Sequence, residues 1–206
     1  MGQKMSRALF GGFLEIYKIF TDNGNNLIVI EEELASKTLR DIILEKREKG
    51  EIFTSEELTK IIQDLVESLY HMHVQNQVVH RDIKPHNIFY TEHRYTFGDY
   101  GEAEQKNVNI LDKKIKMRMN ELKGTPMYME TKLLRLCNRN RLDTQLTSSA
   151  VLTETQVLRL KEAAVDYDPF KADVYSLGLV LFELVLHNAG YTLDDQIETL
   201  FYWQRG

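Results

Sequence analysis

The polar stretch between residues 80 and 87 constrains the fold most, because short apolar pieces bracket it on both sides. Val78-Val79 precedes it, and Ile88-Phe89-Tyr90 and Tyr95-Thr96-Phe97 follow it. Such brief apolar pieces are typical of short strands, and the polar residues between them are typical of loops. The sequence from Val78 to Tyr100 is therefore predicted to fold as short strands that flank loops carrying charged residues.

Helices are predicted on both sides of this stretch. Thr54 followed by Glu57 forms a capping box, and apolar residues then recur at three- and four-residue steps, so an amphipathic helix is expected from there to about His73. A charged helix that ends at Gly50 is expected before it. The sequence Val174–Leu186 is apolar on nearly every face and is predicted to form a buried helix.

A β-hairpin is predicted near the N-terminus. The strand-like sequence Phe13–Phe20 is followed by Thr21–Asn26, which contains an Asn-Gly pair, and by the apolar Leu27–Ile30. An Asn-Gly pair between two such segments is a strong hairpin signal. Further along the chain, Gly101–Lys123 shows no periodicity and is predicted to be a long loop, and Glu154–Val165 is predicted to be a short helix.

Four motifs in a fixed order indicate a family. Residues 80–87 read His-Arg-Asp-Ile-Lys-Pro-His-Asn and match H-R-D-x-x-x-x-N, and Asp99-Tyr100-Gly101 is one aromatic exchange away from D-F-G. The segments Gly124-Thr125-Pro126-Met127-Tyr128 and Asp173-Val174-Tyr175-Ser176-Leu177-Gly178 then follow. In these motifs the chain resembles the eukaryotic protein kinases of the Ser/Thr type, over roughly residues 13–187.

The resemblance implies an α+β, protein-kinase-like fold. Residues 1–206 would be a partial protein kinase domain. In that arrangement residues 13–33 form a remnant hairpin of the N-terminal lobe together with the hinge. Residues 34–206 form a mainly helical C-terminal lobe, with an insert at about 133–168.

The resemblance also implies catalytic roles. Phosphoryl transfer asks a protein mainly for positioning and for charge stabilisation. Asp82 matches the carboxylate that takes the proton of the incoming hydroxyl, and Lys84 matches the cation that neutralises charge on the transferred group. Thr125 matches the residue that ties its own loop to this Asp and Lys. Asn87 and Asp99 match the two ligands of Mg²⁺, an ion that prefers oxygen ligands.

The nucleotide would be held by further residues. Glu31 and Glu33 lie where hinge backbone groups meet the adenine edge of ATP, and Phe89 resembles the floor under the adenine. ATP and Mg²⁺ are therefore the expected cofactors, and Asn87 and Asp99 are expected to contribute to nucleotide binding as well as to metal binding. Residues 80–87 correspond to the catalytic loop of the family. Asp173 is expected to anchor the backbone of this loop, and the alternative role for this residue is that of a helix N-cap.

The sequence departs from the family in its first part. It contains no G-x-G-x-x-G, and no V-A-I-K-like segment precedes the first strand. The predicted hairpin would then stand for the whole N-terminal sheet, and a two-stranded sheet is only marginally stable alone in water. Three explanations stay open: this small lobe is unstable, a regulatory protein partner completes it, or Met1 is not the true start of the chain.

The segment after the D-Y-G motif also differs from the usual pattern. Glu102–Lys123 contains no Ser, Thr or Tyr, so phosphorylation, the usual switch of this loop, has no acceptor there. Glu121 lies close to where a phosphorylated residue often sits. One hypothesis is that Glu121 supplies a fixed negative charge facing Arg81, and the alternative is a solvated side chain.

Three functions are compared. The first is an enzyme, a protein serine/threonine kinase that transfers the ATP γ-phosphate to Ser or Thr hydroxyls of proteins. It rests on the presence of Asp82, Lys84, Asn87 and Asp99. The alternative is a catalytically weak pseudokinase that acts as a binding or scaffolding module. The third is a small-molecule phosphotransferase of related fold, which Arg81 and the Gly124-Thr125-Pro126 segment disfavour.

The amino-acid composition limits the kinds of partner that the chain is expected to bind and the compartment in which it is expected to lie. Lys and Arg total 26 against 31 Asp and Glu, a net charge of −5, which disfavours a nucleic-acid partner. The longest apolar run is too short to span a membrane. Cys137 is the one cysteine, so no internal disulfide can form, which fits the reducing environment of the cytoplasm or nucleus. A protein substrate is the expected partner.

Overall fold

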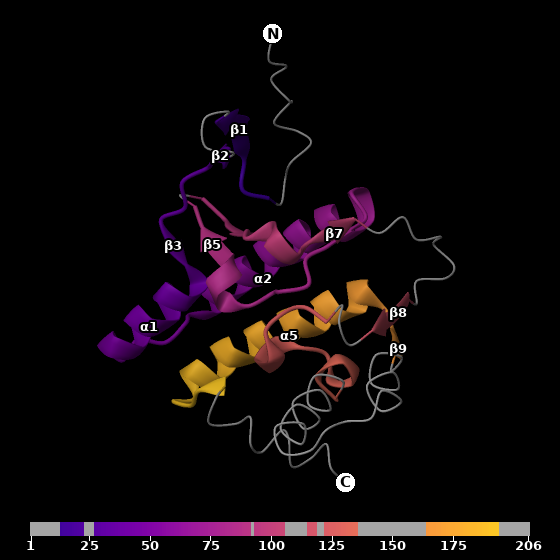
Figure 1. Ribbon diagram of the computed structural model, residues 1–206. Helices are drawn as coiled ribbons and strands as arrows, with labels where there is room; N and C mark the ends of the chain where they lie inside the picture. The colour runs from indigo at the N-terminus through magenta and orange to yellow at the C-terminus, as the bar shows by residue number, and fades with distance from the viewer. Residues whose placement is uncertain are drawn as a thin grey trace, which may run out of the picture. The chain divides into compact units, whose positions relative to one another are not determined.

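The computed structural model describes residues 13–22, 27–91, 93–105, 115–118, 122–135 and 164–193. The chain divides into two compact units. Unit 1 comprises Met1–Asn76, Pro85–Tyr100 and Leu181–Gly206, and unit 2 comprises Gln77–Lys84 and Gly101–Val180. Helices and small antiparallel sheets occur together in the described residues (Figure 1), which confirms the predicted α+β class.

The predicted hairpin is present in unit 1. Strand β1 (Ile16–Asp22) pairs antiparallel with β2 (Leu27–Glu32), with an irregularity in register between Ile16 and Lys18. The first strand begins three residues later than predicted, because Phe13 instead bridges to Phe97. The predicted Asn-Gly turn lies outside the described residues. This sheet has two strands among the described residues.

Two capped helices follow in unit 1. Helix α1 (Leu39–Lys49) begins with a capping box between Thr38 and Asp41 and ends at Gly50, whose φ of 66° is left-handed. Helix α2 (Ser55–Tyr70) begins with the predicted capping box between Thr54 and Glu57. It ends three residues before the expected end at His73, because the backbone continues as a π-helical turn over His71–Gln75. The core of the unit includes Ile43, Ile61 and Leu65, which are fully buried.

A three-stranded sheet in unit 1 confirms two of the predicted short strands. Its order is β3 (Lys37–Thr38), β5 (Ile88–Tyr90) and β6 (Tyr95–Phe97), all antiparallel. Gly98, directly after β6, packs so closely that a Cβ atom there would lie 2.7 Å from the Phe89 ring. A larger residue at position 98 would therefore require the Phe89 ring to shift.

Unit 2 contains two small sheets where a loop was predicted. Strand β4 (Val78–Val79), itself predicted, pairs with β7 (Glu104–Gln105), and β8 (Ile115–Arg118) pairs with β9 (Ala164–Tyr167). The expectation of an unbroken loop over 101–123 is therefore wrong. The predicted helix at 154–165 is wrong at its last two residues, which belong to β9, and the rest lies outside the described residues. Each strand pairs with a partner distant in sequence, which local periodicity does not reveal.

Helix α5 (Pro169–Asn188) contains the predicted apolar helix and extends it at both ends. Its buried residues include Leu177, Val180 and Leu184. The expectation of burial on nearly every face is wrong, since Val174 and Val185 are 53% and 55% exposed. Among the described residues, no helix combines the length and the apolar character needed to cross a membrane.

Candidate active site

The part of the catalytic loop that lies in unit 2, residues 80–84, is anchored by a buried carboxylate. Asp173, on α5, is 2% exposed. Its two oxygens accept hydrogen bonds from the backbone N–H groups of His80, at 2.7 Å, and Arg81, at 2.9 Å. The alternative role of Asp173 as the helix N-cap is wrong, because Asp168 accepts the bonds from the first turn of α5. Asp173 therefore fixes the loop backbone, as predicted.

Arg81 and Gly124 show how tightly this loop is folded. Arg81 has a φ of 72°, in the left-handed region that non-glycine residues rarely adopt. Gly124 has a φ of 103°, and a Cβ atom there would lie 2.4 Å from the Arg81 carbonyl oxygen. The backbones of residues 81 and 124 therefore approach each other at a distance that only glycine allows.

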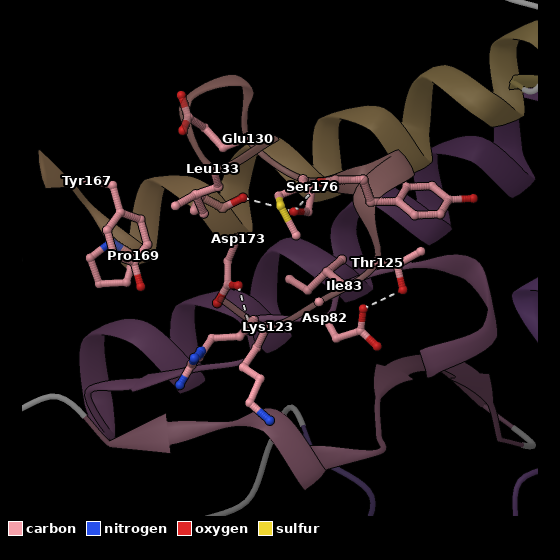
Figure 2. A pocket seen from close by; sticks show the side chains of 15 residues that line it. Asp82, Ile83, Lys123, Thr125, Glu130, Leu133, Tyr167, Pro169, Asp173 and Ser176 are labelled. Atoms are coloured by element: carbon pink, nitrogen blue, oxygen red, sulfur yellow. Dashed lines mark hydrogen bonds between the residues drawn. The ribbon is translucent and has the colours of Figure 1, made fainter. Parts of the chain in front are cut away.

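Asp82, Lys84 and Thr125 form one hydrogen-bonded cluster in unit 2. Lys84 Nζ donates to Asp82 Oδ2 at 2.7 Å and to Thr125 Oγ1 at 2.9 Å, and Thr125 Oγ1 donates to Asp82 Oδ1 at 2.7 Å. Figure 2 shows the bond between Thr125 and Asp82. The three residues that the sequence singled out as catalytic are thus in direct contact.

The cluster keeps the Asp82 carboxyl ionised. Burial by itself raises the pKa of Asp82, but the hydrogen bonds from Lys84 and Thr125 and the charge of Lys84 outweigh it, so the pKa lies below its usual value. The backbone N–H of Asp82 also donates to His80 Nδ1 at 3.3 Å. Asp82 is therefore a charged acceptor at neutral pH, and its backbone N–H is engaged by His80.

A pocket opens beside this cluster, within unit 2 (Figure 2). Asp82 and Thr125 contribute to its wall together with the apolar Leu133 and Tyr167. Charged side chains, Lys123 and Glu130, also line it. A segment of polypeptide that presents a hydroxyl to Asp82 would meet both apolar and charged groups here.

The two predicted Mg²⁺ ligands lie in unit 1. Asn87 is buried and precedes β5, and Asp99 follows Gly98 after β6. Ile88 pairs with Phe97 and the Gly98 N–H donates to the Asn87 carbonyl at 3.0 Å. Asn87 and Asp99 therefore flank the same end of the β5–β6 hairpin.

Their chemistry fits Mg²⁺. Asp99 is exposed with a left-handed φ of 57°, and within the described residues its carboxylate has no hydrogen-bond or ion-pair partner. Amide and carboxylate oxygens suit Mg²⁺, which usually keeps several waters beside one or two protein ligands. Among the described residues no group of three or more His, Cys, Asp or Glu gathers as a metal site.

The residues predicted to meet the adenine are occupied in part by contacts within unit 1. The Glu33 N–H donates to the Glu15 carbonyl at 2.7 Å, and the Glu33 carboxylate pairs with Arg94 at 3.2 Å. Glu31 is exposed, and Phe89 is half-buried with its ring against Gly98. The N–H of Glu33, one of the expected hinge donors, is therefore already engaged by the chain itself.

Sequence reasoning missed Glu104. Its carboxylate Oε2 lies 2.7 Å from Arg81 Nη1, whereas Glu121, the residue hypothesised to face Arg81, lies outside the described residues. The acidic sequence of residues 102–104 was visible, but the pairing of β7 with β4 places Glu104 beside the catalytic loop, and that pairing has no local signal. Position in the sheet, not spacing in the sequence, identifies this contact.

Comparison with known proteins identifies the family. The family model for the protein kinase domain matches residues 8–151, and the chain belongs to that family. The eIF-2-alpha kinase GCN2 of Schizosaccharomyces pombe is 31% identical over 170 residues, which cover 80% of this chain and 9% of that protein. The fold is therefore the α+β fold of protein kinases, as the sequence predicted.

Two further relatives give the same result. The eukaryotic translation initiation factor 2-alpha kinase 1 of Rattus norvegicus is 34% identical over 128 residues, covering 61% of this chain and 17% of that protein. A putative serine/threonine-protein kinase of Mycoplasma pneumoniae is 27% identical over 165 residues, covering 79% and 36%. The chain thus spans between 9% and 36% of the length of these three relatives.

Proposed function

We propose that this chain is an ATP-dependent protein serine/threonine kinase, which transfers the γ-phosphate of ATP to Ser or Thr hydroxyls of proteins. The observation that carries the proposal is the cluster of Asp82, Lys84 and Thr125, in which an ionised carboxylate is held by two donors. Membership of the protein kinase family and relatives named as serine/threonine kinases support it.

In this proposal Asp82 accepts the proton of the substrate hydroxyl. The hydroxyl oxygen forms a bond to the γ-phosphorus, the bond from that phosphorus to the bridging oxygen breaks, and ADP leaves with the electron pair. Lys84, 2.7 Å from Asp82, brings a positive charge to the transferred group. Thr125 holds the Asp82 carboxylate in one orientation, which would let it receive the proton of the incoming hydroxyl.

The nucleotide and the metal belong to the same proposal. Asn87 and Asp99 would hold Mg²⁺, which neutralises charge on the phosphate oxygens when bound. Glu31 and Glu33 would meet the adenine through backbone groups, and Phe89 would lie under it. Because the Glu33 N–H is engaged by Glu15, adenine binding at that atom requires the hairpin to release it.

An assay of the purified chain tests the proposal. With Mg²⁺-ATP and a Ser/Thr peptide library, Asp82→Asn is expected to lower the transfer rate by about 100-fold or more, because a general base typically contributes that much. Thr59→Ala, an exposed position on α2, serves as the control variant and is expected to keep the wild-type rate. Equal rates for Asp82→Asn and wild type would contradict the proposed role of Asp82.

A binding or scaffolding role is the second candidate. The observation that favours it is that the Glu33 N–H, expected to meet the adenine, already donates to the Glu15 carbonyl. Ligand at 100 times its Kd stabilises a protein by about 2.7 kcal/mol. A thermal shift with ATP that requires Mg²⁺ and vanishes in Asp99→Ala favours the kinase, and no shift in a folded sample favours the scaffold.

The proposal extends to the partners of the chain and to its cellular location. We propose a regulatory protein partner that adds a strand to the β1–β2 sheet, which has two strands among the described residues and would be marginally stable alone. The single cysteine agrees with a cytoplasmic or nuclear location. The acidic composition agrees with protein substrates and disfavours nucleic acid.

A further inference from the structure

The pocket of unit 2 contains one carboxylate that no cation of the described residues neutralises. Glu130 lines this pocket together with Asp82 and Tyr167 (Figure 2). The Glu130 side chain is half-buried, and its Oε2 accepts a hydrogen bond from the backbone N–H of Lys132 at 3.0 Å. Within the part of the chain that the structure describes, that bond is the only contact of the carboxylate. Glu130 Oε1 therefore has no partner there.

The two cations on the pocket wall already have carboxylate partners. Lys123 pairs with Glu102 at 3.1 Å, and the guanidinium of Arg81 pairs with Glu104 at 2.7 Å. Neither cation is in contact with Glu130. An anion that entered the pocket would meet cations whose charge is already balanced, whereas a cation would meet a carboxylate whose charge is not.

The other two carboxylates of the pocket are also engaged. Asp82 pairs with Lys84 at 2.7 Å, and Asp173 accepts hydrogen bonds from two backbone N–H groups. The charged side chains that line the pocket or pair with its lining are three cations and five carboxylates, namely Arg81, Lys84 and Lys123 against Asp82, Glu102, Glu104, Glu130 and Asp173. The surplus of carboxylates makes the field in the pocket negative, and a negative field attracts a positively charged ligand.

The apolar part of the wall completes the match to one kind of side chain. Leu133 is 6% exposed and Tyr167 is 5% exposed, and Ile83 and Pro169 line the same pocket. Lys and Arg bury their methylene stems along apolar surface while the charged end stays with a polar partner. An apolar wall that ends at a carboxylate without a cation is therefore complementary to a Lys or Arg side chain.

We propose that Glu130 is a specificity-determining residue, which selects protein substrates that carry a Lys or Arg close to the acceptor Ser or Thr. This rests on the proposed kinase function and deepens it by naming the substrate class. The basic side chain would enter the pocket while the acceptor hydroxyl meets Asp82, since Asp82 and Glu130 line the same pocket. Glu130 takes no part in the transfer step itself.

A purely structural role for Glu130 predicts a different result. Residues 131–135 are helical, and a side-chain oxygen that accepts from an N–H of the first turn is typical of a helix cap. Glu130→Gln keeps an oxygen that can accept this bond and removes the charge. The variant therefore separates capping, which needs the oxygen, from selection of a basic side chain, which needs the charge.

Pairs of peptides that differ in one residue test the proposal on the full chain. Each pair has Lys in one peptide and Met in the other, at one of the positions within three residues of the acceptor. For the best pair, wild type is expected to show a kcat/KM about fivefold higher for the Lys peptide, as suits a half-buried ion pair. Glu130→Gln is expected to reduce this ratio to about one while the value for the Met peptide changes less than about twofold. Added salt is expected to lower the ratio of wild type.

Asp166→Asn is the matched control, because it removes one negative charge a single residue away from the pocket. Asp166 is exposed on β9 next to Tyr167, and successive side chains of a strand point to opposite faces. This variant is expected to keep the ratio of wild type. Glu130→Lys is expected to reverse the preference, so that a peptide with Glu at the same position becomes the better substrate.

Binding of the labelled peptides without ATP, measured by fluorescence anisotropy, separates this inference from the proposed function. If wild type transfers no phosphate, the proposed function fails, and the Kd values of the Lys and Met peptides decide about Glu130. Three results overturn the inference: equal values for the Lys and Met peptides in wild type, a preference of wild type for an acidic peptide, or an equal loss for both peptides in Glu130→Gln. The first two need no variant, so they decide even if Glu130→Gln does not fold.

Discussion

The catalytic loop of unit 2 and the β1–β2 hairpin of unit 1 are held by different interactions. In the loop, backbone N–H groups of His80 and Arg81 meet the buried carboxylate of Asp173. In the hairpin, strand pairing is the main restraint, and the cross-strand pair of Ile19 and Ile30 is 61% and 54% exposed. The first region is fixed by buried polar contacts, and the second presents apolar side chains to its surroundings.

The difference shows that the loop that carries Asp82 and the hairpin depend on different sources of stability. Asp82, Lys84 and Thr125 are held together by contacts within unit 2, so they need no ligand to take up this geometry. Among the described residues the hairpin is a sheet of two strands, and such a sheet gains little from burial and is marginally stable alone. If the chain binds ATP as proposed, positioning of the nucleotide is expected to depend on contacts that cover the hairpin.

The largest expected effect comes from removing the anchor of the loop. Asp173→Ala leaves the N–H groups of His80 and Arg81 without their acceptor, and hydrogen bonds to a charged group contribute about 1.5–3 kcal/mol each. The free energy of unfolding is expected to fall by about 3–5 kcal/mol. Urea unfolding followed by circular dichroism measures it.

Asp168→Ala is the control for that change. Asp168 caps the same helix by accepting from Phe170 and Lys171, so its loss is expected to cost about 1 kcal/mol. Equal losses for the two variants would mean that Asp173 acts only as another residue of the helix start, and the contrast between loop and hairpin would then lose its main support.

A smaller effect is expected from Thr125→Val, which removes one donor to Asp82. Because the Thr125 hydroxyl helps to lower the pKa of Asp82, the pKa is expected to rise toward its usual value of 3.8. Loss of the bond is expected to lower stability at pH 7 by about 1 kcal/mol. Carboxyl-carbon NMR titration measures the pKa, and Thr125→Ser, which keeps the hydroxyl, is expected to leave it low.

The direction of the pH effect follows from the lowered pKa. A carboxyl with a lower pKa in the folded state contributes stability above its unfolded value, 3.8, and this contribution is lost as the pH falls through the folded value. Thr125→Val is therefore expected to lose less stability than wild type below about pH 4. A steeper acid loss in the variant would show that other carboxylates, and not Asp82, dominate in this range.

The sequence predicted those parts of the molecule that carry local signals. The capping box at Thr54, the end of α1 at Gly50, the hairpin and the strands β4, β5 and β6 all follow from residues a few positions apart. The α+β kinase fold followed from the motifs. The contact of Asp82, Lys84 and Thr125 agrees with the geometry that these motifs imply, and the roles of these residues stay predictions.

Features that depend on distant partners escaped prediction. The β8–β9 pair joins segments more than forty residues apart, and neither strand is long or apolar enough to be recognised alone. The exposed face of α5 was not predicted either. Its sequence is apolar on nearly every face, and such a sequence does not show which face packs against the rest of the protein. The Arg81–Glu104 ion pair required the register of β4 with β7.

The smallest effect is expected in the hairpin. The same substitution, Ile to Val, is made once in the buried core and once in the hairpin, and the two losses of unfolding free energy are compared. Ile61→Val, in the fully buried core, is expected to cost about 0.5–1.5 kcal/mol, whereas Ile19→Val in β1 is expected to cost less than about 0.5 kcal/mol, because an exposed methyl group gains little from folding. Urea unfolding at two protein concentrations measures both. A cost at Ile19 equal to that at Ile61 would show that Ile19 is covered in solution, and a dependence on concentration would assign the cover to a second copy of the chain.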